Sequence, residues 1–249
     1  MCRHLAYLGP PATLAAVLSD PPHGLVRQSW APREQRYGTV NADGFGVGWY
    51  ADGDPVPARY RRAGPIWADA SFPDITRVTR SRALLAAVRS ATDGTAPGAA
   101  AAAPFAADRW LFSHNGRLNA WPGAAATLAG TLPPGELLTL EARTDSALAW
   151  ALVLHRLRAG DGLAGALAGT VADLDRHRIA GRFNFLLTDG EVIAATAAGD
   201  TLYYRAPATQ VVVASEPTDD QPGWAAVPDR SVLTARPGAV DVSPLRPAG

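Results

Sequence analysis

The stretch Met1-Cys2-Arg3-His4-Leu5-Ala6-Tyr7-Leu8-Gly9 opens the chain and contains its only cysteine. A short, largely apolar run that ends at Gly9-Pro10 is typical of a β-strand, so residues 2–8 are predicted to form the first strand. Cys2 directly follows the initiator methionine, and a small second residue permits removal of that methionine. We therefore expect the mature chain to begin with Cys2, which would carry a thiol and an α-amino group on one residue.

A terminal cysteine of this kind can act as a nucleophile. Its own α-amino group, with an ordinary pKa of about 7.7 to 8.0, can accept the proton of the thiol near neutral pH. Two other roles fit the position of Cys2: a small apolar residue in a strand, or the acceptor of a lipid anchor. A dyad with His4 or His114 is a third arrangement, but nothing in the local sequence resembles a papain-type protease.

The composition of the 249-residue chain excludes several classes of function. Its 23 basic and 23 acidic residues cancel, so the basic footprint of nucleic-acid or anionic-membrane binding is absent and a small-molecule substrate is favoured. The chain has no lysine, which excludes a Schiff-base lysine and a P-loop lysine. No zinc-type spacing of His and Cys is present, so no metal and no cofactor are expected.

The first residues lack a signal peptide, and we expect a cytoplasmic protein. The sequence gives no indication of oligomeric state.

The order of predicted elements favours an α+β fold in one domain covering residues 1–249. Strands come first, helices lie in the middle, and strands follow again, which suits packed layers better than a parallel βαβ array. Helical spacing predicts helices at residues 11–18, from residue 145 onward, and at 162–173. The alanine-rich residues 95–104 are expected to be a surface loop. Further strands are predicted at residues 45–50, 84–89, 110–114, 182–188, 191–196, 202–205, 210–215 and 231–235.

Three short motifs could carry chemistry. Asn115-Gly116 offers a side-chain amide and an unhindered backbone N–H that could hold an oxyanion, although such a pair is usually a turn. Arg89 and Thr92 could bind a carboxylate, whereas most arginines here should be solvated surface charges. Asp145 could accept hydrogen bonds from a substrate ammonium, or else Asp145 or Thr144 could simply cap the helix.

Together these motifs resemble the glutaminase domains of class II glutamine amidotransferases, a family of N-terminal-nucleophile hydrolases. The resemblance implies a four-layer αββα sandwich in which Cys2 is the nucleophile and Asn115 and Gly116 form the oxyanion hole. It also implies that Arg89 and Thr92 bind the α-carboxylate of a γ-glutamyl group and that Asp145 accepts its α-ammonium.

Within that superfamily, the chain looks most like the γ-glutamyl hercynylcysteine S-oxide amidohydrolases of ergothioneine biosynthesis. This resemblance is carried by residues 1–9, 41–50, 65–67, 113–116 and 214–217, and it implies hydrolysis of a γ-glutamyl amide. The alternatives are another γ-glutamyl amide as substrate, a glutaminase subunit that supplies ammonia to a separate synthase, and a non-catalytic binding module. The expected partner is therefore a small γ-glutamyl substrate, with no nucleic acid and no membrane.

The leaving amine of such a substrate carries a trimethylammonium group, which aromatic faces or a carboxylate could hold. One segment between the first helix and Arg89 could assemble a pocket of this kind, and for any single residue ordinary packing is the simpler interpretation. The candidates are Trp30, Tyr37, Trp67, Asp69 and Phe72.

Overall fold

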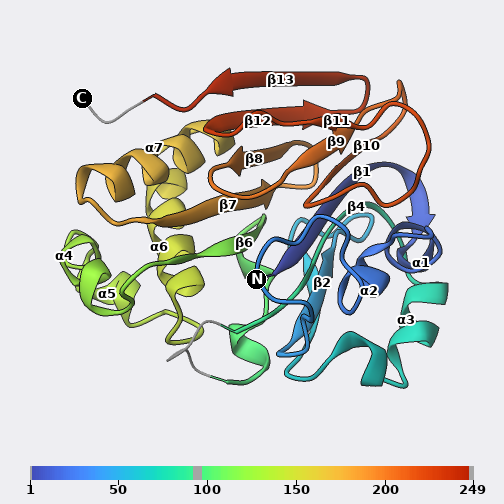
Figure 1. Cartoon of the computed structure of the whole chain (residues 1–249), viewed down its shortest axis with the longest axis horizontal. Coiled ribbons are helices and arrows are strands. Elements are labelled where there is room, and N and C mark those ends of the chain that lie inside the picture. The colour runs from blue at the N-terminus through green and yellow to red at the C-terminus, as the bar shows by residue number, and fades with distance from the viewer. Residues whose placement is uncertain (1, 92–96, 247–249) are drawn as a thin grey trace.

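The computed structural model describes residues 2–91 and 97–246. Two antiparallel sheets pack face to face, and helices cover the outer face of each sheet (Figure 1). Three clusters of buried side chains fill the spaces between these four layers. The αββα sandwich implied by the family resemblance is therefore confirmed.

The first sheet has the strand order β11-β9-β10-β1-β4-β2-β3, and the second has the order β13-β12-β8-β7-β6-β5. The strands of the first sheet are β11 (Ala225–Ala226), β9 (Tyr203–Arg205), β10 (Val211–Ala214), β1 (Arg3–Thr13), β4 (Arg80–Val88), β2 (Phe45–Trp49) and β3 (Ala58–Arg62). Those of the second are β13 (Ala239–Pro244), β12 (Ser231–Arg236), β8 (Ile193–Ala197), β7 (Gly181–Thr188), β6 (Trp110–Leu118) and β5 (Phe105–Ala107).

Helices of two sizes form the outer layers. The first sheet is covered by α1 (Leu14–Leu18), α2 (Leu25–Gln28) and α3 (Phe72–Val78). The second is covered by the longer α6 (Asp145–Arg158) and α7 (Leu163–Arg176), with the short α4 (Ala126–Ala129) and α5 (Pro134–Leu137) beside them. In the described part of the chain, no helix combines the length and the apolar character needed to cross a membrane.

Strand β1 lies at the centre of the first sheet, between β10 and β4. Successive side chains of a strand point to opposite faces. Leu5 and Tyr7 accordingly pack toward the helices, while Ala6 and Leu8 pack between the two sheets. Because β1 has a partner on each side, the cysteine just before it is held at a fixed place at the end of the sheet.

Two glycines in β2 allow the segment before β5 and strand β6 of the second sheet to pack closely against β2. Phe45 and Val47 pack toward the helices, while Gly46 and Gly48 alternate with them on the opposite face. A Cβ atom on Gly46 would lie 2.5 Å from the Ala103 carbonyl oxygen, and one on Gly48 would lie 2.7 Å from the Leu111 side chain. Because glycine has no side chain, Ala103 and Leu111 can occupy the space beside these two residues.

Three expectations from the sequence need correction. The helix predicted at residues 11–18 begins only at Leu14, because β1 continues to Thr13, whose hydroxyl caps the helix by accepting from Ala16 N. The strand predicted to end at His114 continues to Leu118, so Asn115-Gly116 lies within β6, paired with β7, and is not a turn. The third correction concerns residues 97–104, the described part of the predicted surface loop, in which Ala101 and Ala102 are buried.

Candidate active site

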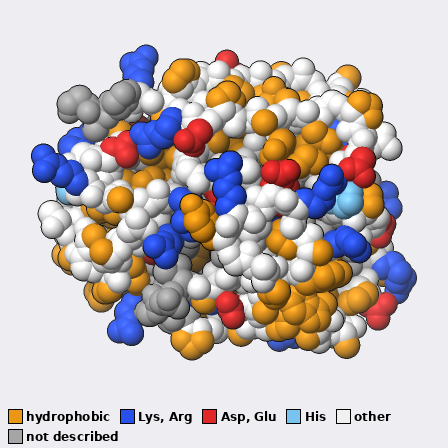
Figure 2. All heavy atoms as spheres, viewed as in Figure 1, with side chains coloured by type: hydrophobic (Ala, Val, Ile, Leu, Met, Phe, Trp, Pro, Cys, Tyr) orange, Lys and Arg blue, Asp and Glu red, His pale blue; other side chains and the backbone are white. Residues whose placement is uncertain are grey.

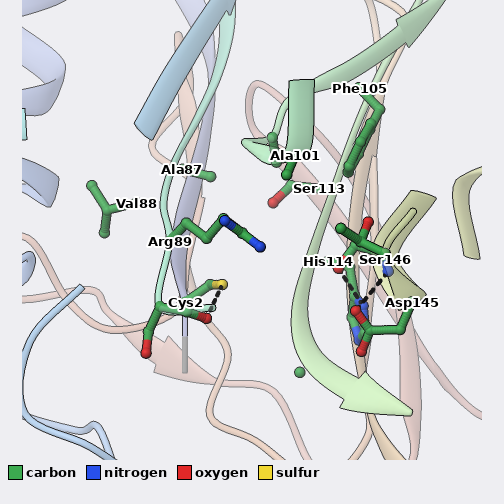
Figure 3. Close-up of a pocket in the computed structure, with 14 residues that line it drawn as sticks. Cys2, Ala87, Val88, Arg89, Ala101, Phe105, Ser113, His114, Asp145 and Ser146 are labelled. Atoms are coloured by element: carbon green, nitrogen blue, oxygen red, sulfur yellow. Dashed lines mark hydrogen bonds between the residues drawn. The ribbon is translucent and has the colours of Figure 1, made fainter. Parts of the chain in front are cut away.

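A narrow cleft lies where the ends of the two sheets meet, and Cys2 lines it. The free space within it is about 20 Å³, enough for about one water molecule. Figure 3 shows Cys2 and Arg89 on one wall and His114, Asp145 and Ser146 on the other. The lining residues are Cys2, Ala87, Val88, Arg89, Ser90, Ala101, Ala103, Phe105, Ser113, His114, Gly116, Thr144, Asp145 and Ser146.

Cys2 is half-buried, and its Sγ lies 3.7 Å from the Ser90 carbonyl oxygen. Burial raises the pKa of its thiol above the usual value, because the thiolate is less well solvated there than in water. The resting group is therefore the thiol at neutral pH. A nucleophilic Cys2 needs a base that takes the proton as the sulfur attacks.

Arg89 follows β4 and is held by the segment that precedes β2. Its N–H donates to the Gly44 carbonyl oxygen at 2.7 Å, and its Nη1 donates to the Asp43 carbonyl oxygen at 3.1 Å. The Asp43 carboxylate in turn accepts from Ala91 N at 2.8 Å. These contacts hold the guanidinium beside the cleft. Thr92, the second predicted carboxylate-binding residue, lies outside the described residues.

On the opposite wall, Gly116 lies at a point where no side chain fits. A Cβ atom on Gly116 would overlap the Arg182 carbonyl oxygen of β7 and would lie 2.6 Å from His114 Nε2. The residue before it, Asn115, is fully buried and is not among the residues that line the cleft. Its Nδ2 donates to Ser215 Oγ at 3.3 Å. The structure thus brings Gly116 to the cleft and places the Asn115 amide just behind the cleft wall.

Asp145 is the first residue of α6 and is buried at the cleft wall. Its Oδ2 accepts from Leu118 N at 3.0 Å and its Oδ1 accepts from Ser146 N at 2.9 Å. Thr144 is the residue that caps the helix, through an acceptor contact with Ala147 N at 3.1 Å. Because Thr144 performs the capping, the carboxylate of Asp145 is not needed for it.

Neither histidine near Cys2 is placed to act as its base. His4 is fully buried and contacts Ser113 Oγ at 3.2 Å, and burial lowers its pKa to about 3. His114 Nε2 donates to the Arg182 carbonyl oxygen at 2.8 Å, which leaves Nδ1 to accept from Ser146 Oγ at 3.1 Å. Burial also lowers the pKa of His114. Both rings are therefore neutral at pH 7, and within the described residues neither makes a hydrogen bond to Cys2, which argues against a papain-type dyad.

A buried charge network surrounds Arg3, the first residue of β1. The Arg3 guanidinium, with no exposed surface, is 3.7 Å from Asp200 and 3.8 Å from Glu216. The Glu216 carboxylate also accepts from the backbone N–H groups of Arg33 and Glu34, each at 2.9 Å. Buried charges of this kind are tolerated when they are paired. Glu216 thus joins the residue after Cys2 to the loop that precedes β2.

The aromatic residues proposed for cation binding do not gather at the cleft. Trp30 and Trp67 form an edge-to-face pair with centroids 5.8 Å apart, and both are nearly half exposed. Tyr37 stacks on the Arg182 guanidinium at 4.6 Å, so a cation of the protein already contacts its ring. Asp69 accepts from Tyr60 and from Phe72 N at the start of α3, and Phe72 belongs to the core. None of the five is among the described residues that line the cleft. On the face shown in Figure 2, acidic and basic side chains are interspersed.

The alanine-rich segment supplies part of the cleft that the sequence did not predict. Ala101, Ala103 and Phe105 line it. Arg61 Nη1 donates to the carbonyl oxygens of Ala100 and Ala102, both at 3.3 Å. An apolar, low-complexity run gives no signal for such a role, because its position depends on contacts with β3 that are distant in sequence.

Comparison with known proteins places the chain in a family. The model of the class-II glutamine amidotransferases matches residues 13–210, and the chain belongs to that family. It is 43% identical to the γ-glutamyl-hercynylcysteine sulfoxide hydrolase of Mycolicibacterium smegmatis over 98% of this chain and 100% of the relative. It is 39% identical to the enzyme of the same name from Mycobacterium tuberculosis over 98% of this chain and 97% of the relative.

A solved structure also resembles it along its whole length. The glutamine aminotransferase class-II domain protein of Silicibacter pomeroyi superimposes with a TM-score of 0.71 at 26% identity, and the match covers 99% of this chain and 100% of that one. The family resemblance predicted from the sequence is thus confirmed.

Proposed function

We propose that this protein hydrolyses the γ-glutamyl amide bond of γ-glutamyl hercynylcysteine S-oxide, releasing glutamate and hercynylcysteine S-oxide. Two relatives at 43% and 39% identity carry that activity in their names, and the matches span nearly the full length of both chains. The substrate class is a small γ-glutamyl amide.

In the proposed reaction the Cys2 thiol attacks the γ-carbonyl carbon while its proton passes to the Cys2 α-amino group. This route needs no histidine and suits a thiol whose pKa burial raises. The tetrahedral intermediate collapses as the proton moves to the leaving amine, giving a γ-glutamyl thioester. Water then attacks the thioester, and the products are glutamate and the free thiol.

The other predicted site residues have proposed roles along the γ-glutamyl group. Arg89 pairs with the α-carboxylate through its planar guanidinium, with Thr92 as a second donor. Asp145 accepts hydrogen bonds from the α-ammonium. Gly116 N–H and the Asn115 amide stabilise the oxyanion. The N-terminus of α6 carries a partial positive charge, so a carboxylate at Asp145 is favoured there.

The observation that carries this proposal is the placement of the nucleophile and the two opposite charges in one cleft. Cys2, Arg89 and Asp145 come from sequence positions far apart, yet all three line the same narrow space. A positive and a negative side chain together match the zwitterionic head of a γ-glutamyl group. A cleft with only one of these two charged side chains would instead suit a ligand with a single carboxylate or a single amine.

The test is to incubate the purified protein separately with γ-glutamyl hercynylcysteine S-oxide and with glutamine, and to measure glutamate release. We expect a much larger kcat/KM with the first substrate. Cys2→Ala is the matched control, since it removes the sulfur and should abolish turnover while the fold remains. Comparable kcat/KM for glutamine would instead indicate a glutaminase that supplies ammonia. Turnover of the Cys2→Ala protein would exclude Cys2 as the nucleophile.

A further inference from the structure

Ser215, directly after β10, connects the nucleophile strand to the predicted oxyanion hole. Its backbone N–H donates to the His4 carbonyl oxygen at 3.0 Å, and its Oγ accepts from His4 N at 3.0 Å. Both backbone polar groups of His4, two residues after Cys2, are thereby fixed to one residue. Ser215 is completely buried, so water does not compete for these contacts.

The same hydroxyl oxygen contacts Asn115. Asn115 Nδ2 donates to Ser215 Oγ at 3.3 Å, and within the described residues this is the only hydrogen bond of the Asn115 side chain, whose Oδ1 has no partner. A primary amide has two N–H groups. One N–H directed at Ser215 restricts the rotation of the amide and leaves the other N–H for a different acceptor.

We propose that Ser215 is a positioning residue that orients the Asn115 amide toward the oxyanion and sets its position relative to Cys2. This inference rests on the proposed function, in which Asn115 stabilises the oxyanion. Preorganised donors stabilise developing charge because they need no reorganisation during the reaction. A single oxygen that contacts both the nucleophile strand and the donor amide supplies that preorganisation. It also gives a chemical role to the serine of the Ala214-Ser215-Glu216-Pro217 segment.

The test is a double-mutant cycle on kcat with γ-glutamyl hercynylcysteine S-oxide. Asn115→Ala should lower kcat by about 10²- to 10³-fold. Ser215→Ala should lower kcat by roughly tenfold while KM changes by less than about twofold, since the lost interaction belongs to the transition state. In the Asn115→Ala background, Ser215→Ala should cause almost no further loss of kcat, because the amide that it orients is gone.

Thr196→Val is the matched control. Thr196 Oγ1 is buried and accepts from Phe185 N at 3.0 Å, but Thr196 lies on β8 and does not line the cleft. The control should lower the melting temperature as Ser215→Ala does and leave kcat unchanged. If Ser215→Ala does not fold, Ser215→Cys keeps the size of the side chain with a weak acceptor and is carried through the same cycle.

The outcomes separate this inference from the proposed function. The positioning role is overturned if Ser215→Ala and Asn115→Ala lower kcat additively. It is also overturned if Ser215→Ala lowers the melting temperature and leaves kcat unchanged. An Asn115→Ala protein with unchanged kcat overturns the oxyanion role in the proposed function itself. Loss of activity in Asn115→Ala with no coupling to Ser215 leaves the proposed function standing and refutes only the inference.

Discussion

Replacement of His4 by glutamine should make the protein less sensitive to acid. Burial lowers the pKa of His4 in the folded state to about 3, whereas the unfolded value is 6.5. Below pH 6.5 the unfolded chain therefore binds a proton that the folded chain does not. The stability contributed by the neutral ring is fully present above pH 6.5 and is lost as the pH falls toward 3.

The size of this effect follows from the two pKa values. Between pH 7.5 and pH 5 the protonation of His4 in the unfolded chain should remove about 2 kcal/mol of the free energy of unfolding. The lowered pKa of His114 acts in the same direction. A loss of this size is a large fraction of the stability of an ordinary domain.

Urea unfolding at pH 7.5 and pH 5 measures the effect. The decrease in the free energy of unfolding between the two pH values should be about 2 kcal/mol smaller in His4→Gln than in the original protein. Ser113→Ala is the control, because it removes the hydrogen-bond partner of His4 and keeps the titrating ring. It should lower stability by about 1 kcal/mol at pH 7.5 and keep the steep pH dependence. Equal pH dependence in the original protein and His4→Gln would refute the reasoning.

Four further predictions concern the cleft. The active protein should have the mass of a chain that begins at Cys2, and full activity with Met1 retained would exclude the α-amino base. Gly116→Ala should abolish activity and lower the melting temperature, since its Cβ would overlap the Arg182 carbonyl oxygen; Gly123→Ala, with open space around it, is the control. Arg89→Lys should raise KM at least tenfold because a bidentate contact is lost, and unchanged KM would remove Arg89 from the carboxylate site. Asp145→Asn should lose less activity than the original protein when the substrate is N-acetylated, and equal losses would remove Asp145 from the ammonium site.

The sequence predicts the parts of the fold that depend on local pattern. The short apolar run over residues 2–8 and the helical spacing from Asp145 are local signals of this kind, and both elements are present in the structure. The predicted end of β6 at His114 is wrong. Asn115-Gly116 favours a turn locally, whereas β7 supplies a hydrogen-bonded partner for β6 as far as Leu118. Tertiary pairing outweighs a local preference there.

Some of the predicted site residues lie together in the structure, and others do not. The sequence predicts Cys2, Arg89, Gly116 and Asp145 as site residues, and the structure brings all four to one cleft. Their individual roles stay predictions, as does a single domain over residues 1–249. Thr92 lies outside the described residues. The cation pocket stays a prediction too. The neighbours of an aromatic ring depend on tertiary packing, and Tyr37, for example, contacts Arg182 of the distant strand β7.

The residues that hold the reactive groups were the hardest to predict, for a physical reason. Ser215 and Glu216 act through contacts with His4, Asn115 and the Arg33–Glu34 backbone, all far away in sequence. A serine or a glutamate near a strand end has no local pattern that distinguishes it from a surface residue. What distinguishes these two is complete burial, with side-chain contacts to β1, to the Asn115 amide and to the backbone of Arg33 and Glu34. Burying a hydroxyl and a carboxylate without compensation costs several kcal/mol, so their positions are defined by the groups that they hold in place.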